Sequence, residues 1–348
     1  MIYIIITIYI LLIFIILFPP TRKKIENIIY LSLGIVLFFI AAFRNGDNVR
    51  DYSVYETMYE QISYGYNITV EITFFWISKL CYIVFNNQII FLFIIYALIG
   101  VLLKLTAIRQ LTSLHLLSLI IYLANFFILH EMTQMRVGIA AGCLLLSIKS
   151  IKDRNWKYFL TLSCIGFLFH YSALIILPLW FLSNKSCSKW MLFLIPIAYI
   201  VYFTKYNLME LIYPFIPIKN IQSKIEGYQE LQIIGDSVWN EINVFNMVFV
   251  GKIVIFYFLL LNRKVIQKHN QYFPILMKIF CISLFILPTF ATIPVIAFRI
   301  SELYGIIEII LIPFLVYAFK PPIISKSIIL IIATTLLYVS IFYNPLIT

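Results

Sequence analysis

Long apolar runs, separated by short polar segments, are the feature that most constrains how this chain can fold. A helix needs about 20 apolar residues to cross a hydrocarbon core of about 30 Å. Of the 348 residues, 63% are hydrophobic and 12% are charged, which excludes a water-soluble fold. We predict a single all-α polytopic membrane domain over residues 1–348, with about 11–12 membrane helices that include short half-helices. The predicted segments lie near 2–18, 27–43, 88–103, 114–129, 133–149, 157–169, 171–183, 190–204, 241–261, 273–290, 300–318 and 323–343.

Basic residues gather in the segments between these runs and indicate the topology. Loops rich in lysine and arginine stay on the cytoplasmic side of a membrane, so both chain ends are expected on the outer face. Orientation in the membrane also accounts for the net charge of +11, and no nucleic-acid partner is predicted. The basic clusters are Arg22 to Lys24, Lys104 with Arg109, Lys149 to Lys157, Lys185 with Lys189, Arg263 to Lys268, and Lys320 with Lys326.

Two stretches do not fit a simple series of crossings. If 72–85 crossed the membrane, Lys104 and Arg109 would lie outside, so we expect a re-entrant or interfacial helix there. The run 157–182 is long enough for one span, yet both its ends carry basic loops. Two half-length helices that meet at His170 satisfy the charge rule, and His170 then lies at the bottom of a pocket.

Two predicted outer loops, 44–71 and 205–240, combine tyrosines with carboxylates. Aromatic rings stack on the apolar faces of sugars, and acids bind sugar hydroxyls, so these loops suit a carbohydrate. The same composition also describes an ordinary interfacial belt of aromatic residues. Composition by itself favours the belt.

Three arginines lie at the predicted outer ends of spans, where basic residues have no orienting role. They are Arg44, Arg136 and Arg299. Arg136 lies in the polar segment 130–136, which separates two apolar runs. Buried or half-buried guanidinium groups usually have a function, and a bound diphosphate would explain three of them. The alternative is that each arginine pairs with a nearby acid: Arg44 with Asp47 or Asp51, Arg136 with Glu131, and Arg299 with Glu302.

No cofactor and no metal site are predicted. The five cysteines are scattered without a metal-binding spacing, and His130 and Glu131 are adjacent rather than spaced one helical turn apart. There is also no glycine-rich phosphate loop. The chemistry must therefore come from ordinary side chains.

The outer-face residues also carry a family resemblance. Their order along roughly 30–315 resembles the EpsG-type branch of the Wzy polysaccharide polymerases. This chain differs from the family pattern in having Met135 between Gln134 and Arg136, and in offering two aspartates, Asp47 and Asp51, for one position. The matching residues are Arg44, Asp51, Tyr52, Tyr55, Val70, Glu71, Gln134, Arg136, Phe169 to Leu174, Pro178, Arg299, Tyr304 and Pro313.

The resemblance implies a multi-pass enzyme of the bacterial inner membrane with a periplasmic or extracytoplasmic active face. Such polymerases move a growing glycan from undecaprenyl diphosphate onto the next lipid-linked repeat unit, and a chain-length regulator and a flippase are possible partners. Arg136 and Arg299, then Arg44, would stabilise the leaving diphosphate. Asp51, Asp47 or His170 would accept the proton of the attacking hydroxyl. The expected substrate-binding residues are Arg44, Asp47, Tyr52, Tyr55, Glu71, Gln134 and Tyr304.

Three other activities remain open at this stage. A flippase for lipid-linked oligosaccharides would need charged groups through both halves of the membrane and often shows internal repeats, which this chain lacks. An O-antigen ligase would use the same donor with a different acceptor. A membrane O-acetyltransferase would also use a buried histidine but does not require several outward arginines.

Overall fold

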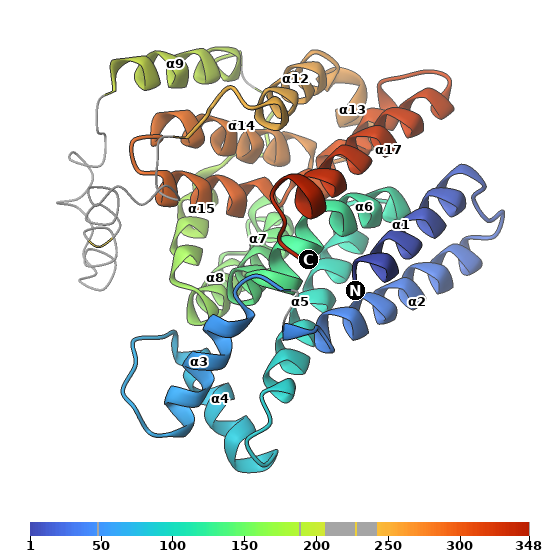
Figure 1. Ribbon diagram of the computed structural model, residues 1–348. Helices are drawn as coiled ribbons and strands as arrows, with labels where there is room; N and C mark the ends of the chain where they lie inside the picture. The colour runs from blue at the N-terminus through green and yellow to red at the C-terminus, as the bar shows by residue number, and fades with distance from the viewer. Residues whose placement is uncertain (47–48, 188, 206–226, 228–241, 348) are drawn as a thin grey trace.

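The computed structural model describes residues 1–46, 49–187, 189–205, 227 and 242–347, and within these ranges the protein is helical (Figure 1). The β pairing among them is one isolated bridge between Val49 and Ile347. The first part of the chain forms α1 (Ile2–Leu17), α2 (Lys23–Ala42), α3 (Tyr52–Ser63), α4 (Ile72–Val84), α5 (Ile90–Leu111), α6 (His115–Ile121), the π-helix η2 (Tyr122–Thr133), α7 (Met135–Asp153), α8 (Trp156–Phe169) and the 3₁₀ helix η3 (Tyr171–Phe181). The second part forms α9 (Met191–Thr204), α12 (Met247–Leu261), α13 (Arg263–His269), α14 (Phe273–Thr289), α15 (Pro294–Gly305), α16 (Glu308–Leu311), η6 (Ile312–Tyr317), α17 (Pro322–Tyr338) and η7 (Val339–Tyr343).

The prediction of an all-α polytopic membrane protein is confirmed. Four described helical segments are long and apolar enough to cross a membrane, and shorter apolar helices accompany them. The four are Lys23–Ala42, Ile90–Leu111, His115–Thr133 and Pro322–Tyr343. Most of the predicted outer loop 205–240 lies outside the described residues.

Helix α7 forms the centre of the bundle and packs against α5 and α8. Glycines allow these close approaches. A Cβ atom at Gly142 would lie 2.7 Å from the Leu103 Cβ of α5, and one at Gly166 of α8 would lie 3.4 Å from the Cys143 Cβ of α7. The first and last long helices also lie together, because the Tyr9 hydroxyl of α1 is 2.8 Å from the Thr334 hydroxyl of α17.

The predicted break at His170 is confirmed. Helix α8 ends at Phe169, His170 is extended (φ −157°, ψ 128°), and the chain continues as η3. Such a break frees backbone carbonyls, which need donors inside a membrane. Side chains from outside the broken hairpin supply them: Thr73 donates to Leu168 O (2.7 Å), Tyr304 to Ile175 O (2.5 Å), Arg154 to Leu182 O (2.7 Å) and Lys278 to Ser183 O (2.6 Å).

The polar interruption at 130–136, expected at the outer end of two spans, lies mostly inside a helix. The helix continues through η2 to Thr133, and the direction changes at Gln134. His130 and Glu131 are buried inside the bundle, with 0% and 1% of their surface exposed. The chain does turn within the interruption, but His130 and Glu131 lie inside the bundle because the carboxylate has a buried partner that the sequence did not reveal.

That partner is Lys104, which the sequence assigned to a cytoplasmic loop. Lys104 instead lies inside α5 with 0% exposure, and its Nζ is 2.5 Å from Glu131 Oε1 and 2.5 Å from the Gly138 carbonyl. The Tyr122 hydroxyl also donates to Glu131 Oε1 (3.1 Å). Gly100 leaves the space for this carboxylate, since a Cβ there would be 2.0 Å from Glu131 Oε2.

Candidate functional site

Glu71 lies at the centre of a polar cluster at one end of the bundle. It precedes the first residue of α4, and 1% of its surface is exposed. Its Oε2 accepts a hydrogen bond from Arg136 Nη1, and its Oε1 is 3.8 Å from His170 Nε2. The carboxylate thus joins a residue of α7 to the break between α8 and η3. Figure 1 shows α3 and α4 together at this end.

Arg136 is the second residue of α7, directly after the break at Gln134. Its guanidinium lies 5.4 Å from the centre of the Tyr55 ring and 5.3 Å from that of Phe74, within the range of cation–π attraction. Its Nε is buried and has no hydrogen-bond partner among the described residues. The alternative pairing of Arg136 with Glu131 is wrong, because Glu131 pairs with Lys104 and Arg136 with Glu71.

Arg44 is more deeply buried, with 4% of its surface exposed. It lies just after α2 and donates from Nε to the Ala41 carbonyl (2.9 Å) and from Nη1 to the Met132 carbonyl (2.6 Å). The guanidinium lies 4.6 Å from the Phe93 ring centre. Its Nη2 is buried and has no partner in the described part of the chain. Asp47, one of its predicted partners, lies outside the described residues.

Helix α3 places two tyrosines near these arginines. Asp51, in the left-handed region at φ 67°, precedes the helix. Tyr52 packs on Phe93 with ring centres 4.7 Å apart, and Tyr55 is buried. Burial raises the pKa of the Tyr55 phenol, while the charges of Arg136 and Arg44 lower it and that of Asp51 raises it. Tyr55 is therefore close to both guanidinium groups.

The His170 ring has a defined orientation. Its Nδ1 accepts the backbone N–H of Ser172 (3.2 Å) and lies 2.6 Å from the Ser172 hydroxyl. An accepting Nδ1 leaves the proton of the neutral ring on Nε2, which faces Glu71. No role of its own was predicted for Ser172 from the sequence. A serine two residues after a histidine at a helix start was the available signal.

Arg299 and Tyr304 lie on α15. The Glu302 carboxyl interacts electrostatically with Arg299, as the i, i+3 spacing suggested, and also with Lys252 and Arg50. The Tyr304 hydroxyl donates to the Ile175 carbonyl and so fixes η3 against α15.

Replacing Tyr304 with phenylalanine should destabilise the protein by about 1 kcal/mol, the usual contribution of one such hydrogen bond. The Ile175 carbonyl then loses the donor that Tyr304 supplies. Thermal unfolding in detergent measures this change. Tyr338→Phe, on an exposed tyrosine of α17, is the matched control and should leave the unfolding temperature unchanged.

A second ion pair was missed by sequence analysis. Lys252 Nζ of α12 lies 2.8 Å from Glu308 Oε1 of α16, and Glu308 is buried. Opposite charges inside two predicted spans were the only signal, and a sequence does not show which spans touch.

The cluster suits an anion better than a metal ion. Its two guanidinium groups offer donors, and the described residues contain no group of three or more His, Cys, Asp or Glu side chains that could hold a metal.

Comparison with known proteins assigns the family. The model of the EpsG family matches residues 27–346. This chain belongs to the EpsG family. It is also similar to the amylovoran biosynthesis protein AmsC of Erwinia amylovora, with 23% identity over 306 residues that cover 84% of this chain and 80% of AmsC. No solved structure matches.

The EpsG-family match includes every predicted site residue. The structure brings five of them into one cluster, through Glu71 and through the rings near the two arginines; they are Arg44, Tyr55, Glu71, Arg136 and His170. Asp51 and Tyr52 begin the helix that carries Tyr55, and Gln134 forms the break before α7. Tyr304 of α15 touches η3, whereas Arg299, on the same helix, is exposed and lies beside Glu302.

Proposed function

We propose that this EpsG-family protein is a polysaccharide polymerase. It would transfer a growing glycan from undecaprenyl diphosphate onto the next lipid-linked repeat unit, at the extracytoplasmic face of the bacterial inner membrane. Three findings support this: the family, the similarity to a protein named for amylovoran biosynthesis, and the apolar helices. The sequence has no glycine-rich phosphate loop, and the donor bond already stores the needed energy in its diphosphate.

The observation that carries the proposal is a pair of unused donors. Arg136 Nε and Arg44 Nη2 are buried without a hydrogen-bond partner among the described residues, and both guanidinium groups act on Tyr55. Buried donors without partners are rare and call for an explanation. A diphosphate accepts several such hydrogen bonds, and its negative charge would offset the cost of burying two cations.

The same cluster offers a proton acceptor. An acceptor hydroxyl attacks the anomeric carbon, the bond from that carbon to the diphosphate oxygen breaks, and the lipid diphosphate leaves with the electron pair. The hydroxyl proton passes to a carboxylate, for which Glu71 is the first candidate and Asp51 the second. His170 Nε2 lies 3.8 Å from Glu71 Oε1, close to the carboxylate but beyond hydrogen-bond distance. Arg136, Arg44 and Arg299 would stabilise the leaving group.

A deletion strain tests the function directly. Without this protein, cells should keep single repeat units on their lipid carrier and lose long glycan chains. Repeat units trapped on the inner side would indicate a flippase. Long chains that accumulate on the carrier and fail to reach their final acceptor would indicate a ligase. Either of these two results would contradict the polymerase proposal.

Arg299→Ala should lower polymerisation by at least about 100-fold, as expected when one charged donor to a leaving group is removed. Chain length is read from glycan ladders in the complemented deletion strain. Arg22→Ala, at an exposed position before α2 and at the opposite end of that helix from Arg44, is the matched control and should restore normal ladders. Normal ladders with Arg299→Ala would remove Arg299 from the site.

A further inference from the structure

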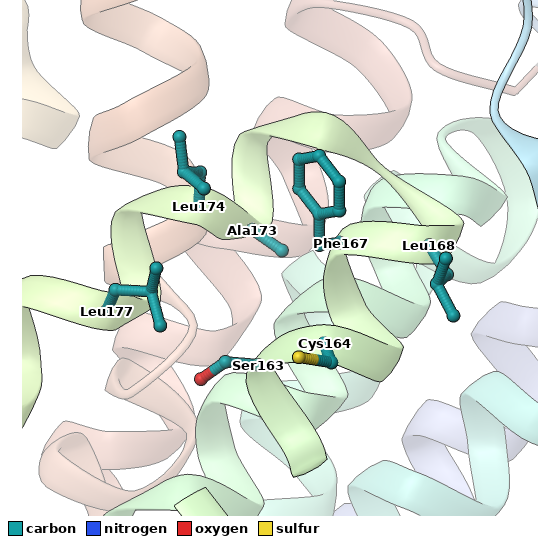
Figure 2. Close-up of a pocket in the computed structure, with 7 residues that line it drawn as sticks. All are labelled: Ser163, Cys164, Phe167, Leu168, Ala173, Leu174 and Leu177. Atoms are coloured by element: carbon teal, nitrogen blue, oxygen red, sulfur yellow. The ribbon is translucent and has the colours of Figure 1, made fainter. Parts of the chain in front are cut away.

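A lipid-facing groove runs between the two halves of the broken hairpin. Its volume is about 260 Å³, and its lining comes from α8 and η3 and is almost entirely apolar (Figure 2). Small side chains at Ser163, Cys164 and Ala173 leave the space, and the larger Leu168 and Leu177 contribute to its walls. The groove is thus a direct result of two short helices that meet at His170 with small residues between them.

This groove is open to the hydrocarbon that surrounds a membrane protein. Leu168 and Leu174 retain 42% and 36% of their surface as exposed area, and Cys164 is exposed as well. Apolar, concave surface of this kind is filled by a hydrocarbon chain in a bilayer. Its occupant must therefore be the tail of a lipid.

The position of the groove indicates which lipid. The Leu168 side chain lines it, and the Leu168 carbonyl accepts a hydrogen bond from Thr73, two residues after Glu71. His170, two residues after Leu168, faces the Glu71 carboxylate. The Tyr171 hydroxyl also donates to the carbonyl of Val70. One end of the groove therefore adjoins the polar cluster that would hold the diphosphate.

We propose that the groove between α8 and η3 binds the polyprenyl tail of the lipid carrier, at the isoprene units next to its diphosphate. This inference rests on the proposed function, because that function places the diphosphate at Arg136 and Arg44. It assigns a second contact to the same substrate. The carrier is then recognised by its tail as well as by its charge.

A native thiol makes the test possible without a mutation. Cys164 lines the groove and is exposed, whereas the other four cysteines are buried. Full-length protein in detergent micelles is treated with a maleimide, and the labelling rate of Cys164 is followed by mass spectrometry. Undecaprenyl diphosphate should slow labelling about tenfold when its concentration is about ten times its Kd. Cys164→Ser supplies the labelling blank.

Two comparison ligands decide the specificity. Inorganic diphosphate should leave the Cys164 labelling rate unchanged, because it has no tail. A straight-chain alkyl diphosphate with the same carbon number should protect less than the polyprenyl lipid. Equal protection by the straight chain, or no protection by undecaprenyl diphosphate, would overturn the assignment.

A substitution tests the consequence for polymerisation. Cys164→Trp fills the groove and should shorten the glycan ladder, whereas Leu160→Trp, on an exposed position of the same helix that does not line the groove, should leave it normal. A normal ladder with Cys164→Trp would contradict the assignment. If undecaprenyl diphosphate protects Cys164 but deletion of the protein leaves long chains intact, the proposed function is refuted and the groove assignment stands. If deletion removes long chains but the lipid does not protect Cys164, the groove assignment is refuted and the proposed function stands.

Discussion

Arg136→Ala should abolish polymerisation, with a loss of at least about 100-fold in long-chain product. The guanidinium supplies the unused Nε donor of the cluster and neutralises the buried Glu71 carboxylate. Glycan ladders from a deletion strain that carries the variant measure the effect. Arg136→Lys should also be inactive, because an ammonium group cannot reproduce the fork of donors. Normal chain lengths in either variant would refute the assigned role.

A paired variant separates loss of chemistry from loss of folding. Arg136→Ala alone leaves Glu71 buried without its cation, which costs about 3–5 kcal/mol when one partner of a buried pair is removed. Adding Glu71→Gln removes that charge and should restore the amount of inserted protein. The double variant should remain inactive. Recovery of activity along with expression would show that the pair has a structural role only.

Lys104→Met should lower stability by about 3–5 kcal/mol, because it leaves the Glu131 carboxylate without its cation at 1% exposure. Thermal unfolding in detergent and the amount of protein in the membrane both measure this. Lys104→Met combined with Glu131→Gln should recover most of the loss, since the Tyr122 hydroxyl can still bond to the amide.

The matched control lies in α4, a helix that packs against α5. Lys79→Met, on α4 beside the rings of Phe75 and Trp76, removes a lysine that has no buried carboxylate partner among the described contacts and should change stability by less than about 1 kcal/mol. If Lys104→Met is as mild as this control, the buried pair does not hold α5 against η2.

The apolar pattern predicted the helical segments well, because a helix that crosses a bilayer is made of apolar residues along most of its length. The break at His170 was also predictable. The apolar run 157–182 has a basic loop at each end, and the charge rule places both loops on the same side of the membrane, so the chain must turn back within the run. In both cases the information lies within one stretch of sequence. The structure also brings Arg44, Arg136 and His170 into one cluster with Glu71, as the ordered resemblance implied.

The pairing of charges could not be predicted in the same way. Glu131 is close in sequence to Arg136, yet it pairs with Lys104 because η2 continues the helix and carries the carboxylate into the bundle. Lys104 was assigned to a loop because the apolar run ends near it, whereas α5 extends to Leu111. Ion pairs between helices depend on which faces touch, and helix periodicity alone does not determine that.

Hydrogen bonds from four side chains hold the carbonyls of 168–183 and fix the position of η3 relative to α8. Their donors, Thr73, Arg154, Lys278 and Tyr304, lie outside the groove lining. Loss of one donor would let η3 tilt relative to α8 and would change the width of the groove. Preference for one lipid over another can therefore be altered from a distance, by residues that never meet the lipid.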